Sequence, residues 1–130
     1  MSLQILVVED DQPTRAALQR ILEENGCSVD VAADGEQAIG RLALRRYDAI
    51  VLDIALPRVS GTEVMEYIAS TTPEVLESII VVTGLRVEEI RKLFPTVCET
   101  LSKPVIPSRL LDSLRRCTPG LRGRTGIFVA

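Results

Sequence analysis

Residues 47–65 read YDAIVLDIALPRVSGTEVM, and these residues give the clearest indication of the fold. Its first six residues, YDAIVL, form a short apolar run that predicts a buried β-strand, and Asp53 is the next residue in the sequence. The segment with proline, serine and glycine that follows predicts a loop. From residue 62 to residue 70, apolar side chains recur at helical spacing and predict an α-helix. The stretch therefore encodes one strand followed by one helix.

The same alternation of strand and helix signals runs through the rest of the chain. Pro13 suits the first turn of a helix, because its missing N–H would have no partner there. The Asn25-Gly26 pair suits the end of that helix, and Asp34 is a good N-cap for the next. Besides the unit above, we expect strands at residues 3–8, 27–32, 78–82 and 100–102, and helices from Pro13 to Asn25, from Asp34 to about Arg46, and over residues 87–93 and 107–116.

Five strands that alternate with five helices predict an α/β domain of the (βα)5 type. In such proteins the strands form one parallel sheet with helices on both faces. The strand candidates are nearly continuous apolar runs, which is typical of strands that are buried on both faces. The 130 residues fit one domain, and a composition with 46% hydrophobic but only 3% aromatic residues predicts an aliphatic core.

Composition also argues against several classes of function. The net charge of −3 argues against direct nucleic-acid contact by this domain, because nucleic-acid-binding surfaces are basic. No apolar run is long enough to span a membrane, so we expect a soluble, cytoplasmic protein without membrane contact. Cys27, Cys98 and Cys117 match no zinc-binding spacing, and the chain has no histidine. We expect three buried or half-buried thiols in a reducing compartment.

Polar residues directly follow four of the five predicted strands. Glu9 and Asp10 follow the first strand, Asp53 the third, Thr83 the fourth and Lys103 the fifth. Because ligands of open α/β sheets bind at the carboxyl ends of the strands, we expect these five residues to converge. Taken one at a time, each has a simpler interpretation, as a helix cap, a turn residue, a strand-end hydroxyl or a solvated lysine.

The three carboxylates in this group indicate a metal site. Glu9, Asp10 and Asp53 would repel one another unless a cation neutralised them, and their oxygen ligands favour Mg²⁺. Lys103 supplies a further positive charge. The chemistry that fits is attack of the Asp53 carboxylate on phosphorus to give an aspartyl phosphate, with the Thr83 hydroxyl donating to a phosphoryl oxygen.

Four motifs, ILVVEDD, IVLDIALPRVSGTEVM, IIVVTG and LSKP, resemble in order and spacing the receiver domain of two-component response regulators. The resemblance covers about residues 3–117, so we expect a receiver domain over residues 1–117 and a tail of unknown role over residues 118–130. It implies a flavodoxin-like sheet of order 2-1-3-4-5. It also implies a signalling domain rather than an enzyme, with at most weak self-phosphorylation and autodephosphorylation.

The resemblance assigns roles to single residues. Asp53 would be the phosphoacceptor, and a sensor histidine kinase or a histidine phosphotransfer protein would donate the phosphoryl group from phosphohistidine. Thr83 and Lys103 would contact that group, and the Lys103-Pro104 bond would be cis. The ligands of Mg²⁺ would be Glu9, Asp10, Asp53 and the backbone carbonyl of Ala55.

The output surface that the resemblance implies consists of the predicted helix at residues 87–93, the strand at 100–102 and the helix at 107–116. It would bind a downstream protein, an output domain outside this sequence, or a second copy in a homodimer. Thr100 stands where the family usually has Tyr or Phe, so this chain cannot use the aromatic ring that moves inward in other members.

Two other functions stay open. A phosphorylation-independent pseudo-receiver would be an interaction module only, which the five strand-end residues argue against and Thr100 mildly favours. An aspartate-nucleophile phosphatase would need a second Asp two residues after the nucleophile, where this chain has Ala55. Ala55 and Leu85 lie two positions beyond Asp53 and Thr83, and these positions influence hydrolysis in the family. Both are apolar, which predicts a long-lived phosphorylated state.

Overall fold

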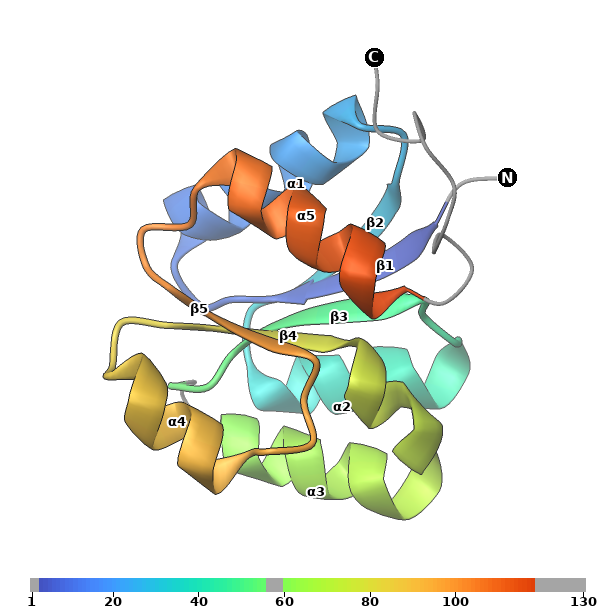
Figure 1. The fold of residues 1–130 in the computed structure, drawn as a ribbon. Helices are drawn as coiled ribbons and strands as arrows, with labels where there is room; N and C mark the ends of the chain where they lie inside the picture. Colours follow the sequence, from blue (N-terminus) through green and yellow to red (C-terminus); the bar gives the residue numbers. More distant parts are fainter. Residues whose placement is uncertain (1–2, 56–59, 119–130) are drawn as a thin grey trace.

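The structure, a computed structural model, describes residues 3–55 and 60–118 as a layer of β-sheet between two layers of helices (Figure 1). All strand pairs are parallel, and the sheet order is β2-β1-β3-β4-β5. The predicted (βα)5 architecture and strand order are therefore confirmed. The strands are β1 (Gln4–Val8), β2 (Ser28–Ala32), β3 (Ala49–Asp53), β4 (Ile79–Thr83) and β5 (Glu99–Ser102).

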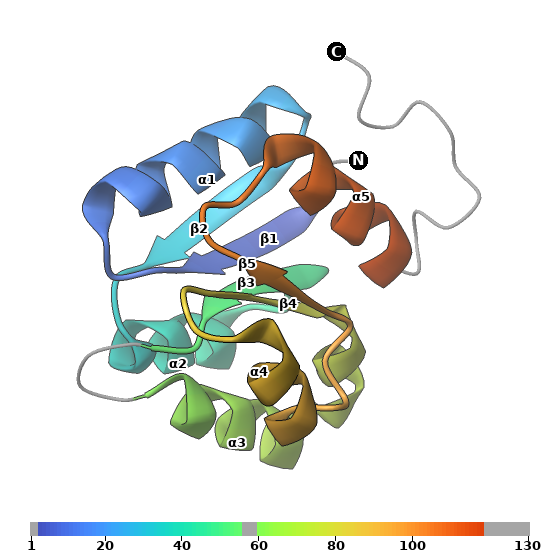
Figure 2. The same cartoon turned by 60° about the vertical axis from the view of Figure 1, so that its left-hand side comes forward.

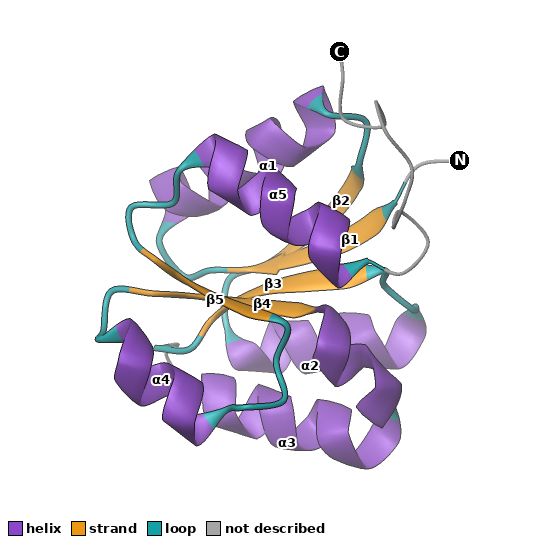
Figure 3. Cartoon of the chain, viewed as in Figure 1, coloured by secondary structure: helices purple, strands orange, loops and turns teal. Residues whose placement is uncertain are grey.

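Helices cover both faces of the sheet, as Figures 2 and 3 show. Helices α1 and α5 lie on one face, and α2, α3 and α4 lie on the other. A 3₁₀ helix, η1, precedes β4 and was not predicted, because its six residues, which begin with a proline, show no apolar periodicity. The helices are α1 (Gln12–Glu24), α2 (Gly35–Leu44), α3 (Gly61–Thr71), η1 (Pro73–Ser78), α4 (Val87–Leu93) and α5 (Pro107–Cys117).

Side chains cap the first two helices, and the Asp34 cap is the one that the sequence predicts. The Asp11 carboxylate accepts a hydrogen bond from the Thr14 N–H at 3.1 Å, and the Asp34 carboxylate accepts one from the Gln37 N–H at 2.8 Å. Gly26, just after the end of α1, has φ of +86°, a left-handed conformation that glycine adopts at little cost. Local chemistry therefore fixes where α1 begins and ends and where α2 begins.

Two apolar cores lie on the two sides of the sheet. Side chains of α1 and α5 close the first core, and side chains of α2, α3 and α4 close the second. Every residue of β3 and β4 is buried, as expected for the inner strands of a covered parallel sheet. Because Asp53 and Thr83 are the last residues of these two strands, burial extends to the edge where the predicted site lies.

Some predicted features fall beyond what the structure describes. The predicted loop before α3 includes residues 56–59, and most of the predicted tail is residues 119–130; both segments are outside the described residues. The boundary between a domain at 1–117 and a tail at 118–130 stays a prediction. Within residues 3–55 and 60–118, every helix is too short or too polar to cross a membrane.

The cysteines require a correction. Cys98 and Cys117 form a disulfide with a Cα–Cα distance of 5.7 Å, whereas we predicted three thiols. The prediction was wrong because spacing alone does not reveal that β5 and α5 run in opposite directions, which brings the residue before β5 next to the last residue of α5. Cys27 is a buried free thiol, as predicted, and burial raises its pKa to about 11.

Candidate functional site

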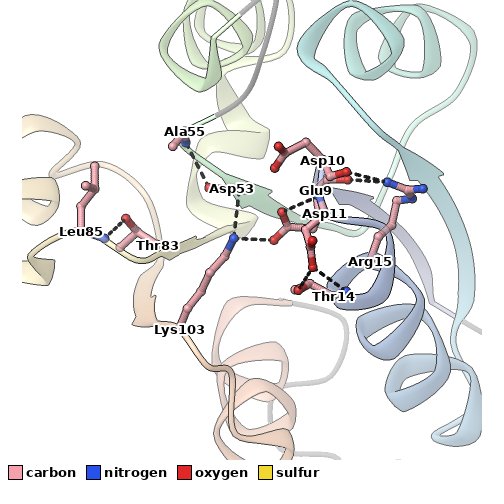
Figure 4. Close-up of polar contacts among 10 residues, drawn as sticks. All are labelled: Glu9, Asp10, Asp11, Thr14, Arg15, Asp53, Ala55, Thr83, Leu85 and Lys103. Carbon is pink, nitrogen blue, oxygen red and sulfur yellow. Dashed lines mark hydrogen bonds and ion pairs between the residues drawn. The ribbon is translucent and has the colours of Figure 1, made fainter.

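The strand-end residues lie at one edge of the sheet, as predicted (Figure 4). Asp53 ends β3, and Glu9 and Lys103 directly follow β1 and β5. The Lys103 N–H donates to the Thr83 carbonyl at 2.8 Å, which extends the pairing of β4 and β5 by one residue. The Lys103-Pro104 peptide bond is cis, as the resemblance implied. This edge therefore brings residues from four strands into one small region.

Three carboxylates converge at this edge. Glu9, Asp10 and Asp53 each offer an oxygen atom, and these oxygens all lie within 4.8 Å of one another. Glu9 is fully buried and Asp53 is 3% exposed, whereas Asp10 is exposed to solvent. Such a group needs positive charge nearby, because like charges at this separation disfavour ionisation.

Lys103 supplies part of that positive charge. Its Nζ lies 2.7 Å from Oε1 of Glu9 and 3.0 Å from Oδ2 of Asp53, and the side chain is 27% exposed. Burial lowers the pKa of this ammonium group, but its hydrogen bonds to Glu9 and Asp53 outweigh burial and raise the pKa above its ordinary value. The lysine is therefore positively charged at neutral pH.

One ammonium group does not compensate all of the negative charge. Burial raises the pKa of Glu9 to about 7, against the opposing effects of Lys103 and of the Asp11 N–H. That N–H donates to Oε2 of Glu9 at 3.2 Å. Near neutral pH the Glu9 carboxylate therefore competes for a proton, and a divalent cation beside it would favour the charged form.

Backbone groups hold the carboxylate and the hydroxyl at the ends of β3 and β4. The Ala55 N–H donates to Oδ1 of Asp53 at 3.0 Å, and the Leu85 N–H donates to Oγ1 of Thr83 at 2.9 Å. Thr83 is fully buried, and among the described residues its hydroxyl makes no hydrogen bond with the Asp53 or Lys103 side chain (Figure 4). The structure thus joins Glu9, Asp10, Asp53 and Lys103, and leaves Thr83 beside them on β4.

Two residues that support this edge were missed from the sequence. Arg15 donates from Nη1 to the carbonyls of Glu9 and Asp10 at 2.9 and 3.2 Å, which fixes the turn between β1 and α1. The only sequence feature that could have indicated this role was the position of Arg15 in the first turn of a predicted helix. Gly61 was assigned only to a loop, but a Cβ atom there would lie 2.6 Å from the Cα and carbonyl oxygen of Ile54. Only glycine permits this close approach beside Asp53.

Comparisons with known proteins agree with this geometry. A model of the response regulator receiver domain matches residues 5–115. A response regulator named MprA, from Mycolicibacterium vanbaalenii, is 37% identical over 123 residues, which are 92% of this chain and 53% of that protein. The chain spans about half the length of the curated relatives it matches.

Solved structures are similar as well. The receiver domain of sensor histidine kinase PA1611 from Pseudomonas aeruginosa, with a magnesium ion coordinated in its active-site cleft, has a TM-score of 0.80 and 29% identity. The similarity covers 90% of this chain and 98% of that one. The BeF3-activated receiver domain of DrrB has a TM-score of 0.77 and 29% identity, covering 89% and 97% of the two chains. The fold, the strand-end carboxylates and the family match thus agree, and the chain belongs to the response regulator receiver domains.

Proposed function

We propose that this receiver domain accepts a phosphoryl group on Asp53 in an Mg²⁺-dependent reaction and thereby changes a protein-binding surface. The observation that carries the proposal is the position of Lys103 Nζ, 2.7 Å from Glu9 and 3.0 Å from Asp53. Phosphoryl transfer depends mainly on positioning and on neutralising negative charge. The Lys103 ammonium group neutralises charge beside the buried Asp53 carboxylate, and the two further carboxylates, of Glu9 and Asp10, can hold a cation that neutralises more.

The donor set fits Mg²⁺. Glu9, Asp10 and Asp53 offer oxygen atoms within 4.8 Å of one another, and Mg²⁺ prefers carboxylate oxygens and water. The raised pKa of Glu9 supports a cation here, because burial leaves its charge incompletely compensated. We assign the backbone carbonyl of Ala55 as a fourth protein ligand. When bound, Mg²⁺ would neutralise charge shared by the carboxylates and the phosphoryl oxygens.

Asp53 is the nucleophile in this proposal. One of its oxygens bonds to phosphorus while the bond from phosphorus to the donor's imidazole nitrogen breaks, and that nitrogen keeps the electron pair. The Ala55 N–H and Lys103 Nζ, each at 3.0 Å from one oxygen, hold the carboxylate in place. Lys103 then pairs with a phosphoryl oxygen. The Thr83 hydroxyl accepts from Leu85 but donates to no described residue, so its proton is available to a second phosphoryl oxygen.

The phosphodonor needs a docking surface beside Asp53, since the chain itself has no histidine. A groove of about 530 Å³ lies between α1 and the segment after β5, and Lys103 is one of its lining residues. The groove is lined mostly by apolar side chains, which suits the helix of a sensor histidine kinase or a histidine phosphotransfer protein. Its lining residues are Pro13, Thr14, Ala17, Leu18, Ile21, Lys103, Pro104 and Val105.

The surface that responds is formed by α4, β5 and α5. Thr100 of β5 is 4% exposed, and its hydroxyl has no hydrogen-bond partner among the described residues. A groove of about 490 Å³ crosses this surface and carries charges of both signs, which suits a homodimer, a downstream protein or an output domain rather than nucleic acid. Its charged lining residues are Glu88, Arg91, Glu99, Arg109, Asp112 and Arg116.

Phosphorylation with a small acyl phosphate, followed by intact-mass measurement, tests the proposal. We expect one phosphoryl group on the wild type with Mg²⁺, and none with a chelator or in Asp53→Asn. Asp112→Asn, an exposed carboxylate outside the site, is the matched control and should be labelled normally. Labelling of Asp53→Asn to the wild-type level would refute the assignment.

Beryllofluoride separates the proposal from the pseudo-receiver alternative. A receiver that takes a phosphoryl group on Asp53 should bind beryllofluoride only with Mg²⁺ and should then change the exchange of amide hydrogens in α4, β5 and α5. A pseudo-receiver would show neither Mg²⁺-dependent binding nor that change. The BeF3-activated DrrB receiver domain supports the choice of this probe.

A further inference from the structure

We propose that Cys98 and Cys117 form a reversible thiol–disulfide site that reacts with small thiols and disulfides and controls α5 independently of Asp53. The two residues are bonded, and their Cα atoms are 5.7 Å apart. That separation lies within the range of roughly 4.4–6.8 Å at which cysteines are bridged without moving the backbone. The bridge therefore forms without displacing the backbone of β5 or α5.

The two sulfur atoms differ in access. Cys98 is half-buried and lines a surface cavity of about 370 Å³ together with Arg91 and Phe94. Cys117 is fully buried in the core beneath α1 and α5. A small thiol can therefore reach Cys98 but not Cys117. This division between an accessible cysteine and a protected partner is the arrangement that redox-responsive cysteine pairs use.

Charge beside the cavity favours exchange at Cys98. Arg91 and Glu99 both line the cavity; Glu99 pairs with Arg116 at 2.9 Å, whereas the Arg91 side chain makes no hydrogen bond or ion pair within residues 3–55 and 60–118. A nearby guanidinium stabilises a thiolate, both on Cys98 and on an incoming small molecule. The third cysteine, Cys27, is buried, and burial raises the pKa of its thiol to about 11, so it should remain an unreactive thiol.

The exchange reaction balances with two equivalents of a small thiol. A thiolate attacks the Cys98 sulfur from the cavity, the Cys98–Cys117 bond breaks, and Cys117 leaves with the electron pair and takes up a proton. A second thiolate then attacks the small-molecule sulfur of the mixed disulfide and releases Cys98. Two small thiols become one small disulfide, and the protein gains two thiols. Oxidation is the reverse reaction, in which one small disulfide is consumed and two small thiols are released.

Reduction would loosen one end of α5. The disulfide ties the residue before β5 to the last residue of α5, two elements that lie side by side (Figures 1 and 2). The neighbouring Arg116–Glu99 ion pair, at 2.9 Å, is partly exposed, with 57% and 27% of the two side chains accessible, and a pair open to solvent holds α5 only weakly. Leu110 and Leu114 stay buried under the helix, so α5 should remain docked while its last turn frays.

The groove proposed for partner binding is built from both bridged elements. Glu99 and Thr100 come from β5, and Asp112 and Arg116 come from α5. A change at the Cys98–Cys117 pair therefore reaches this surface without any change at Asp53. The pair would give the domain a redox input beside its phosphorylation input.

Redox titration of the wild-type chain tests reversibility. The protein is equilibrated in glutathione buffers of increasing reducing strength, quenched with acid, alkylated and analysed by peptide mass spectrometry. We expect the Cys98–Cys117 bridge to disappear in excess reduced glutathione and to return in excess glutathione disulfide. Cys27 should form no disulfide in any buffer. A bridge that survives millimolar reduced glutathione in the folded protein, or one that never forms, would overturn the proposal.

Amide hydrogen exchange tests the structural consequence. Reduction of the wild type should speed exchange several-fold in the last turn of α5, in Asp53→Asn as much as in the unmutated chain. Cys98→Ser should show the fast exchange in every buffer, and Cys27→Ala, the matched control, should respond like the wild type. Exchange in α5 that is identical in the oxidised and reduced wild type would refute the switch, even if Cys98→Ser failed to fold.

Discussion

The Nζ atom of Lys103 lies 3.0 Å from Oδ2 of Asp53, although 50 positions separate the two residues in the chain. They also belong to strands that are not neighbours, because β4 lies between β3 and β5. The Lys103 side chain therefore extends across the end of β4. Its Nζ also lies 2.7 Å from Oε1 of Glu9, the residue that follows β1. A single side chain thus joins the ends of three strands through charge.

Removing this ammonium group should destabilise the fold and impair phosphorylation. Lys103→Met keeps most of the apolar stem but leaves the Glu9 and Asp53 carboxylates without their cation. We expect a loss of about 1–3 kcal/mol in the free energy of unfolding, the range for leaving a buried polar group unpaired. Urea denaturation without divalent cations measures this loss, and acyl phosphate labelling measures the reactivity.

Lys92→Met is the control, because Lys92 is the other lysine of the chain and is exposed on α4. It should leave the free energy of unfolding within about 0.5 kcal/mol of wild type. Equal destabilisation by the two substitutions would contradict the idea that the Lys103 contacts stabilise the strand ends. Normal labelling of Lys103→Met would contradict its role in reactivity.

The raised pKa of Glu9 predicts how stability depends on pH. The pKa is about 7 in the folded protein and 4.5 for an ordinary glutamate, so the folded state holds this proton more tightly than the unfolded state does. The contribution of Glu9 is therefore fully present below pH 4.5 and is lost as the pH rises through 7. Without divalent cations, Glu9→Gln should become progressively more stable than the wild type between pH 5 and pH 8 in thermal denaturation.

Mg²⁺ should remove that disadvantage of the wild type. A cation that binds the ionised carboxylate stabilises the folded state more at high pH, so Mg²⁺ should raise the melting temperature more at pH 8 than at pH 5.5. Glu9→Gln should show a smaller rise, and Glu66→Gln, which removes an exposed carboxylate of α3, should behave like the wild type. A wild-type response to Mg²⁺ that is the same at both pH values would argue against Glu9 as a ligand.

Gly61 should tolerate no side chain. A Cβ atom at this position would lie 2.6 Å from backbone atoms of Ile54, and backbone cannot move aside as a flexible side chain can. Gly61→Ala should therefore lower the free energy of unfolding by about 1–3 kcal/mol, the typical cost of forced overpacking. Because Ile54 follows Asp53 directly, labelling of Asp53 should slow as well.

Gly40→Ala offers the opposite expectation. Gly40 lies in the exposed part of α2, and a Cβ atom added there would meet no other atom within 4 Å, so alanine should stabilise the helix by about 0.5–1 kcal/mol. Chemical denaturation of the two variants side by side measures both effects. Stabilisation by Gly61→Ala would show that the chain around Ile54 can adjust.

The sequence predicts the sheet and the strand-end residues well because both depend on local patterns. The apolar run before Asp53 and the proline after Lys103 are visible without tertiary information, and the parallel topology then brings their ends to one edge. Boundaries were less accurate: β3 begins at Ala49 rather than Tyr47, because strand pairing with β1 begins only there.

Contacts between distant or backbone groups could not be predicted in this way. The Cys98–Cys117 bond depends on how α5 packs, and the contacts of Arg15 with backbone carbonyls depend on the shape of one turn. For Ala55 the resemblance implies a metal-binding carbonyl, which stays a prediction, and the hydrogen bond from its N–H to Asp53 is a separate contact that the sequence did not reveal. Such contacts leave no periodicity or composition signal in the chain.

The residues two positions beyond Asp53 and Thr83 should determine how long the phosphoryl group persists. Ala55 and Leu85 carry apolar side chains that cannot orient a water molecule for attack on phosphorus, and Leu85 is 56% exposed. We expect slow decay of phosphorylated wild type. Ala55→Asn and Leu85→Glu should speed decay by about tenfold or more, since a positioned polar group can assist water attack. Intact-mass measurement after removal of the phosphodonor gives the rates.

Leu93→Glu is the matched control for this last prediction, because Leu93 is also an exposed leucine, at 68%, but lies at the far end of α4. It should leave the decay rate unchanged, and a chelator should reveal whether the faster decay in the other two variants still requires Mg²⁺. If Ala55→Asn and Leu85→Glu decay at the wild-type rate while both are phosphorylated normally, apolar side chains at these positions do not set the lifetime. The lifetime would then depend on how the Lys103 and Ala55 contacts shield the acyl phosphate from water.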